Sequence, residues 1–359
     1  MTPSVVRVAR TIRRAPMLRD RANVIASMAL GASLTWLAFK FVNWAAVNAV
    51  WRLPEGAGSS LCRAARGEGA CWAVVHERFR FVVLGAYPFD EQWRPALACL
   101  LFVSLYVVSA RRAWWKPWLL GFWIAIPASA IALLRGGLAG LTLVPSEFWG
   151  GLPLTFVLST IGFAAAIPPA VALALGRRSR MPVIRVLSVV YIELVRGVPL
   201  VTFLFMSAVM FPLFVPQDFT VDKLLRAQIA LAMVIAAYLA EVVRAGLQAV
   251  PRGQYEAAES MGLSFWPAMI LIVLPQALRI TIPAFVNTFI AFFKDTSLVA
   301  VIGLFDLLGA AKAVLVDPEW VGFGVEVYLF AAAVYFAFCF AVSHYSQRVE
   351  RILMARSHH

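Results

Sequence analysis

Charged side chains are scarce in this chain, and the motifs of several enzyme classes are missing. Only 14% of the residues are Asp, Glu, Lys or Arg, whereas 62% are hydrophobic and the mean hydropathy is +0.80. These values lie far outside the range of soluble domains. The sequence has no Gly-x4-Gly-Lys-Ser/Thr phosphate loop, no His-Glu-x-x-His metal motif and no Ser/His/Asp set around a common site. We therefore expect a membrane protein without a metal site that neither binds nor hydrolyses ATP.

Long apolar segments predict the fold class, an all-α integral membrane protein. A helix needs about 20 apolar residues to cross a hydrocarbon core roughly 30 Å thick. A closed barrel is excluded, because barrels are built from short alternating segments. We predict eight spans, with seven or nine as alternatives: Ile25 to Val50, Pro95 to Ser109, Pro117 to Leu134, Leu154 to Leu175, Leu200 to Val215, Ile229 to Val243, Met269 to Phe292 and Val325 to Ser343.

The distribution of basic residues predicts the orientation of these spans. Lys and Arg number 32 against 19 Asp and Glu, but they form short clusters at span ends instead of a basic surface interleaved with aromatics, which argues against nucleic acid. Such clusters are typically cytoplasmic. The clusters are Arg7, Arg10, Arg13, Arg14, Arg19 and Arg21; Arg177, Arg178, Arg180 and Arg185; and Arg348, Arg351 and Arg356. Both termini are therefore expected in the cytoplasm. The long loop from Arg52 to Arg94, with six arginines, is an exception that would lie outside.

The four cysteines fall into two pairs by environment. Cys99 and Cys339 lie within apolar spans, where a thiol behaves as a small hydrophobic group. Cys62 and Cys71 flank a Gly-rich stretch in the expected outside loop, where an oxidising periplasm permits a disulfide. Closing so small a loop would contribute roughly 2 to 3 kcal/mol. Two unpaired thiols are the alternative.

Gly, Pro and Trp residues between Pro145 and Pro153 predict a boundary in the chain. We expect residues 1–151 to form an N-terminal region with a basic tail, three accessory spans and the outside loop. Residues 152–359 would form a five-span core. No internal repeat stands out, so the inverted-repeat signature of many secondary transporters is not found.

A polar segment between two apolar segments is the most informative part of the sequence. Residues Arg252 to Met261 fit about two and a half helical turns. Pro251 precedes them and Gly262 follows, where left-handed backbone geometry favours glycine. Ala257 and Ala258 keep this helix narrow. Glu256 and Glu259, three residues apart, share a side that can meet basic groups of a partner. The expected docking residues are Tyr255, Glu256, Ala257, Ala258, Glu259 and Gly262.

Several passages occur in the order found in one known family. They are Gly176 to Arg180, Tyr191 to Leu200, Tyr238 to Gly246, Gln254 to Ala258 and Lys294 to Leu298, with Gly262, Ile272, Leu274 and Pro275 at the family's offsets after Glu256-Ala257-Ala258. The chain resembles the polar amino-acid permeases of ABC importers, whose cytoplasmic EAA loop carries a short helix that fits a cleft on the ATPase subunit. Ala70-Cys71-Trp72 and Asp90 to Pro95 are similar to the longer permease of general L-amino-acid importers.

This resemblance implies a fold, a location and a set of partners. The fold is the type I importer permease with a five-helix core, in a multi-pass protein of the bacterial inner membrane. The partners are an ABC ATPase dimer, a second homologous permease, a periplasmic amino-acid-binding protein and the lipid bilayer. ATP and Mg would bind to the ATPase, and no cofactor to this chain. For the docking helix, the alternative is an ordinary loop with a chance Glu-Ala-Ala triplet.

Charges near the span ends form a second group of candidate residues. Glu193 with Arg196, and Glu241 with Arg244, have a helical spacing of three residues that predicts two self-neutralising pairs near the cytoplasmic interface. A structural role and a gating or ATPase-side role are both open.

Lys294-Asp295-Thr296-Ser297 interrupts an apolar stretch just past the expected outside end of the seventh span. It could begin a cavity-lining helix, because an amino acid carries both charge signs, or Asp295 could cap a helix at the interface. Weaker candidates for the solute path are Thr202, Met206, Met210, Asn287 and Thr288, for which packing is the alternative.

Two other classes of function remain open. One is an ion-coupled secondary transporter or channel for small polar solutes. The other is an integral membrane enzyme or scaffold. Neither predicts the docking helix.

Overall fold

The computed structural model describes residues 21–54, 58–111, 114–137, 140–216 and 221–357, and the chain divides at residue 77 into two units. The basic tail as far as Arg19 lies outside the described residues, as do the last two histidines. Within these ranges the secondary structure is helical apart from two isolated β-bridges.

Seven described helices are long and apolar enough to cross a membrane, or eight if one bent pair counts as a span. This confirms an all-α membrane protein with about eight spans. The spans are Asn23–Val47, Phe89–Ala110, Trp118–Arg135, Gly151–Arg177, Lys223–Ala249, Ile282–Ile302 and Gly324–Glu350, and the bent pair is Pro182–Gly197 with Leu200–Phe214.

In the first unit, residues 1–77, the described residues form a long helix followed by a small folded segment. Helix α2 (Arg21–Val42) continues as the π-helix η2 (Asn43–Val47), and α3 (Ser60–Ala64) follows. A disulfide joins Cys62 to Cys71, which are both buried. The indole of Trp72 donates to the carbonyl of Ala45 over 2.6 Å, which holds this segment on the end of its own helix.

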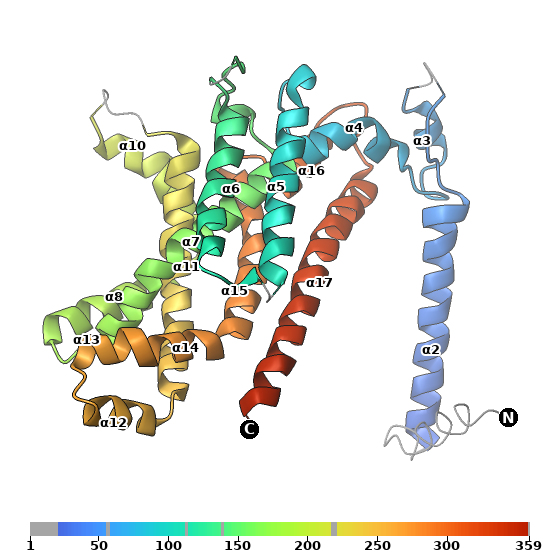
Figure 1. The fold of residues 1–359 in the computed structure, drawn as a ribbon. Helices are drawn as coiled ribbons and strands as arrows, with labels where there is room; N and C mark the ends of the chain where they lie inside the picture. Colours follow the sequence, from blue (N-terminus) through green and yellow to red (C-terminus); the bar gives the residue numbers. More distant parts are fainter. Residues whose placement is uncertain (1–20, 55–57, 112–113, 138–139, 217–220, 358–359) are drawn as a thin grey trace. The chain divides into compact units, whose positions relative to one another are not determined.

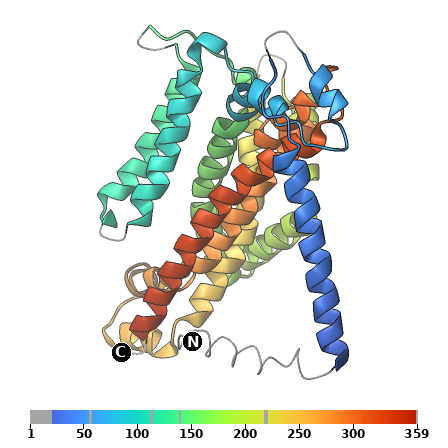
Figure 2. The ribbon, with the colours of Figure 1, turned by 90° about the vertical axis from the view of Figure 1, so that its right-hand side faces the viewer.

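The second unit, residues 78–359, contains the remaining spans (Figures 1 and 2). It begins within α4 (Ala73–Leu84), and its principal helices are α5 (Trp93–Ala110), α6 (Trp118–Arg135), α7 (Gly151–Arg177), α8 (Pro182–Gly197), α11 (Lys223–Ala249), α15 (Ile282–Asp295), α16 (Leu307–Val314) and α17 (Gly324–Ser357). α5 and α6 form an antiparallel hairpin, and α7 packs along α11 at the centre.

Aromatic side chains fill the core between α5, α7, α15 and α17. The rings of Phe293 and Phe338 stack with their centroids 4.1 Å apart, and the ring of Phe156 packs against both of them. Such pairs contribute about 0.5 to 1.5 kcal/mol each beyond their buried area. In lipid, where apolar surface is not driven out of water, this close packing is a main source of helix association.

The expected fifth span was only partly correct. The chain turns by 100° between α8 and the segment that begins at Leu200. Pro199 has an extended backbone there and precedes α9 (Leu200–Phe205), which continues as η6 (Met206–Met210) and α10 (Phe211–Phe214). Proline cannot donate a backbone hydrogen bond into a preceding turn, so a new helix starts beyond it.

The expected seventh span, Met269 to Phe292, is wrong. The chain breaks at Thr281, the residue at which one helix ends, directly before α15 begins. Pro283 lies in the first turn of α15, where its missing N–H needs no acceptor, so it starts a helix there. The span is therefore Ile282–Ile302, formed by α15 and the 3-10 helix η8 (Thr296–Ile302).

The apolar residues before that break form a separate, shorter helical stretch. It consists of α13 (Phe265–Ala268), the π-helix η7 (Met269–Val273) and α14 (Leu274–Ile280). Figures 1 and 2 show it crossing the direction of α15 instead of continuing it.

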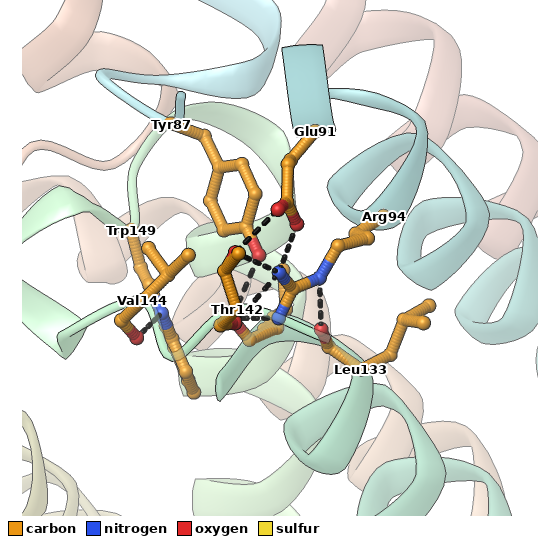
Figure 3. A network of polar contacts seen from close by, with 8 residues as sticks. Tyr87, Glu91, Arg94, Leu133, Thr142, Val144 and Trp149 are labelled. Carbon is orange, nitrogen blue, oxygen red and sulfur yellow. Dashed lines mark hydrogen bonds and ion pairs between the residues drawn. The ribbon is translucent and has the colours of Figure 1, made fainter. Parts of the chain in front are cut away.

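A buried polar network holds one end of the α5–α6 hairpin together (Figure 3). Arg94 is fully buried, pairs with Glu91, and donates to the carbonyl of Leu133 over 2.7 Å and to that of Thr142 over 3.0 Å. The Tyr87 hydroxyl donates to the carbonyl of Leu134 over 2.8 Å, and burial raises its pKa to about 12. This network attaches the connection that leads into α7 to the hairpin.

Candidate functional site

The polar segment forms the expected short helix. α12 runs from Arg252 to Ser260, after Pro251 in an extended conformation, and lies across the end of α11 in Figures 1 and 2. Gly262 has φ +75°, the left-handed geometry that glycine adopts without strain. The N–H groups of Gly262 and Leu263 donate to the carbonyls of Glu259 and Ala258. These two bonds form a Schellman motif, which ends the helix.

One side of α12 is attached to the rest of the second unit. Ala258 is 1% exposed, so it faces the protein's own core and not a partner. The hydroxyl of Tyr255 donates to the carbonyl of Leu247 over 3.0 Å, and Gln276 on α14 donates to the side chain of Gln254 over 2.9 Å. Tyr255 and Ala258, expected to dock a partner, therefore fix the helix in place.

The opposite side of α12 is exposed. It presents Glu256, Ala257 and Glu259, and no hydrogen bond or ion pair to either glutamate side chain is found among the described residues. This face is narrow, acidic and rigidly held. A groove with basic groups on another protein would fit it.

Four charges meet beside α12, where α7, α8 and α11 come together. The guanidinium of Arg177 donates to Glu241 over 2.6 Å and to Glu193 over 3.0 Å, both from Nη1. Arg244 pairs with Glu241 at 2.7 Å, as its spacing predicted. The ion-pair cluster is therefore Arg177, Glu193, Glu241 and Arg244.

The predicted pair of Glu193 and Arg196 is wrong. Arg196 lies over the ring of Tyr238 on α11, with its guanidinium carbon 5.5 Å from the ring centroid. Glu193 pairs with Arg177 instead, because the last turn of α7 lies beside α8. The sequence pattern predicts only a cytoplasmic position for Arg177, since nothing local to the basic run after the fourth span indicates a partner on α8 or α11.

The next residue in the chain connects the cluster to α12. Arg178 donates to the hydroxyl of Tyr255 over 3.4 Å and lies 6.0 Å from its ring centroid. Consecutive arginines at the end of α7 thus contact α8, α11 and α12.

The charged passage at Lys294 lies elsewhere than expected. Lys294 and Asp295 are exposed and end α15, inside the span instead of beyond it. The capping interpretation is wrong, because the Asp295 side chain makes no capping hydrogen bond to η8. Thr296 is buried and donates to the carbonyl of Phe293, whereas Ser297 is half-buried.

The weaker path candidates are mostly exposed on the second unit taken alone. Asn287 lies seven residues before Lys294, so both fall on one face of α15. Thr202, Met206 and Met210 are exposed on α9 and η6, and α9 packs against η8. Thr288 donates to the carbonyl of Ala284, a bond within its own helix. Among the described residues, no group of three or more His, Cys, Asp or Glu could hold a metal ion.

Comparison with known proteins gives a consistent picture. The profile of the family described as "Binding-protein-dependent transport system inner membrane component" matches residues 159–351. The inner membrane amino-acid ABC transporter permease protein YhdY of Escherichia coli K12 is 46% identical over 326 residues, which cover 88% of this chain and 86% of the relative. The glutamate/glutamine/aspartate/asparagine transport system permease protein BztC of Rhodobacter capsulatus is 38% identical, covering 79% of each chain.

A solved structure has a similar fold over part of the chain. It is a crystal structure of an amino acid ABC transporter with histidines, matched with a TM-score of 0.50 and 32% identity. The match covers 56% of this chain and 91% of the solved chain.

Proposed function

This chain belongs to the family of inner membrane components of binding-protein-dependent transport systems, and we propose that it forms half of the solute path in an ATP-driven importer of L-amino acids. It is a multi-pass membrane protein with the fold of ABC importer permeases. The relatives carry amino acids according to their names, and the mixed charge of Lys294 and Asp295 suits a zwitterionic solute.

The exposed face of α12 supports docking to an ATPase subunit. Glu256, Ala257 and Glu259 point away from a helix that is otherwise bound to α11 and α14. A rigidly attached helix transmits a push from a partner, whereas a loose loop would absorb it. ATP and Mg would bind to an ATPase dimer, while this chain acts without catalysis of its own.

The position of α12 supports an orientation in the membrane. The C-terminal end of α17 lies at the same end of the second unit as α12 (Figures 1 and 2). If α12 meets a cytoplasmic ATPase, that end is cytoplasmic, and Arg348 beyond the apolar part of α17 agrees with it. We place both termini in the cytoplasm and the disulfide segment in the periplasm of a bacterial inner membrane.

The path itself requires a second permease. We propose that a homologous subunit covers the exposed residues Asn287, Lys294, Asp295, Thr202 and Met206, with Met210, Thr296 and Ser297 nearby. Charged groups inside a span are costly in lipid, so a partner or an aqueous path must face them. A periplasmic amino-acid-binding protein would deliver the solute, and ATPase closure would alternate access to the path.

The N-terminal region would be an accessory part of this importer. The family profile begins at residue 159, close to the proposed boundary between residues 1–151 and 152–359. We assign the five-span core to transport and the preceding spans to a family-specific addition.

The exposed acidic face of α12 carries this proposal, and co-purification tests it. The full chain is purified from its native membrane, and co-purifying proteins are identified by mass spectrometry. Wild type should retain an ABC ATPase, and Glu256→Lys should lose it while inserting normally. Glu147→Lys makes the same charge change on an exposed residue in η5 (Ser146–Phe148) and should retain the ATPase. Retention of the ATPase by Glu256→Lys would refute docking through this face, and its absence from wild type would refute the importer itself.

A further inference from the structure

One guanidinium holds three helices together at the end where α12 lies. Nη1 of Arg177 reaches Glu241 on α11 and Glu193 on α8 at the same time, over 2.6 Å and 3.0 Å. Glu241 is 17% exposed and has Arg244 as a second partner, whereas Glu193 is 57% exposed. The contact to Glu241 is therefore the firm one, and the contact to Glu193 is the one that can open.

The same end of α7 is closely packed against α8. A Cβ atom on Gly176 would lie 2.2 Å from the hydroxyl oxygen of Ser188, so the backbone of α7 packs directly against a side chain of α8 there. This close contact restricts sliding of α8 along α7, so α8 would tilt about it. Glu193 lies five residues further along α8, on the side toward the bend at Pro199.

α8 is joined by a sharp bend to the segment that follows it. It ends at Gly197, and beyond Pro199 the chain turns by 100° into α9 and η6. α9 packs against η8, which follows Lys294 and Asp295. A tilt of α8 about the Gly176 contact would move α9, and with it the segment beside those two charges.

Arg178, the residue after Arg177, connects the end of α7 to α12. Its guanidinium contacts Tyr255, whose hydroxyl is bonded to α11. A displacement of α12 therefore acts on the end of α7 that carries Arg177. Among the described residues, Tyr255 on the attached side of α12 thus contacts Arg178, the backbone joins Arg178 to Arg177, and Arg177 contacts Glu193 on α8.

We propose that Arg177 is a positioning residue that couples α12 to α8, and that Glu193 is the contact released when α8 tilts. The inference rests on the proposed function, since it gives the docked helix its mechanical output. α8 has two positions, one held by Arg177 and one free of it, and movement of α12 shifts the balance between them.

The functional test uses the full importer in lipid nanodiscs with its partner subunits. ATPase activity is measured with and without the loaded binding protein, together with the amount of bound ATPase subunit. Glu193→Gln should keep the ATPase bound yet reduce the stimulation ratio by about five-fold or more. Arg177→Lys should fall between wild type and Glu193→Gln, because the lysine side chain is one bond shorter and its ammonium group does not reach both carboxylates at these distances. Arg185→Gln, an exposed charge on the same helix, is the control and should match wild type.

A second measurement does not depend on any partner. Spin labels at Leu187→Cys on α8 and Glu259→Cys on α12, both exposed positions, report the distance between these helices in the full chain alone. Glu193→Gln should broaden the distance distribution or add a second population, and Arg185→Gln should leave it unchanged. An unchanged distribution, or a stimulation ratio that falls only in step with lost ATPase subunit, overturns the role of Arg177. A wild-type chain that binds no ATPase refutes the proposed function instead, while the distance measurement still decides the role of Arg177.

Discussion

The hydroxyl of Tyr255 on α12 donates a hydrogen bond to the backbone carbonyl of Leu247 near the end of α11. Residues eight apart in the sequence are thereby joined across the turn between the two helices, at a distance of 3.0 Å. The carbonyl belongs to the last turn of α11, where carbonyl groups lack partners within the helix. One side chain thus completes α11 and fixes the angle of α12.

Removing that hydroxyl should loosen α12 without changing its exposed face. Tyr255→Phe keeps the ring but loses the bond to Leu247 and the longer, exposed contact from Arg178. The bond to Leu247 is worth about 1 kcal/mol, so amide exchange in residues 252–260 should become about five-fold faster. Tyr328→Phe on α17 is the control, because the described residues give its hydroxyl no hydrogen bond. Equal exchange rates in both variants would show that the bond to Leu247 does not hold α12.

The end of α12 should be sensitive to backbone geometry and not to crowding. At Gly262 an added Cβ meets nothing within 4 Å, but φ is +75°, so Gly262→Ala introduces strain alone. We expect a loss of about 1 kcal/mol in the local stability of α12. Gly253→Ala is the matched control, since it is equally open and has helical geometry. Hydrogen exchange should show α12 weakened by the first substitution and unchanged or stabilised by the second.

The network around Arg94 should be costly to break. Arg94→Gln leaves Glu91 without its cation and the carbonyls of Leu133 and Thr142 without their donor. Because Arg94 is fully buried, its loss removes an ion pair and several hydrogen bonds from the interior at once. Thermal unfolding in detergent should show a large decrease in Tm for Arg94→Gln and little change for Arg80→Gln, whose side chain lies over Phe89 at an exposed position. Similar Tm values for the two would contradict the role of the network.

Asp306 should make stability depend on pH. It is buried, it accepts from the N–H of Gly309 over 2.9 Å and from the hydroxyl of Tyr335 over 2.8 Å, and burial raises its pKa above the ordinary 3.8. Between pH 3.8 and the raised pKa the folded chain binds more protons than the unfolded chain. The free energy of unfolding should therefore be greatest at acidic pH and decline as pH rises through that interval.

Thermal unfolding across a pH series checks this sign. The side chain introduced by Asp306→Asn cannot titrate, so the free energy of unfolding of wild type should decline with pH relative to that of the variant over this interval. A wild-type curve that rises with pH there would mean that hydrogen bonds to the carboxylate outweigh its burial.

The parts of the site that the sequence predicted are those with local signals. Pro251 marks the start of α12, and Gly262 allows the left-handed backbone that ends it. Both effects act within a few residues of the chain. Hydropathy likewise located most spans. The break at Thr281 was missed although Pro283 marks it, since an unbroken apolar stretch of span length hides a change of direction.

Contacts between distant residues could not be predicted in the same way. Spacing within α8 pairs Glu193 with Arg196, yet the partner is Arg177, sixteen residues away on α7. That choice depends on how α7 and α8 cross, which the close contact at Gly176 determines. A single sequence contains no local sign of that crossing.

The disulfide between Cys62 and Cys71 bears on how the protein is made. Thiols join where the surroundings are oxidising, so in the proposed orientation the bond closes only after this segment has crossed the bilayer. The closed disulfide then stabilises the folded segment around Cys62 and Cys71 on the periplasmic side, because it lowers the conformational entropy of the unfolded segment. A polar, folded segment cannot slip back through lipid. In the proposed orientation, the closed bond therefore opposes the return of this segment through the bilayer after α2 has inserted.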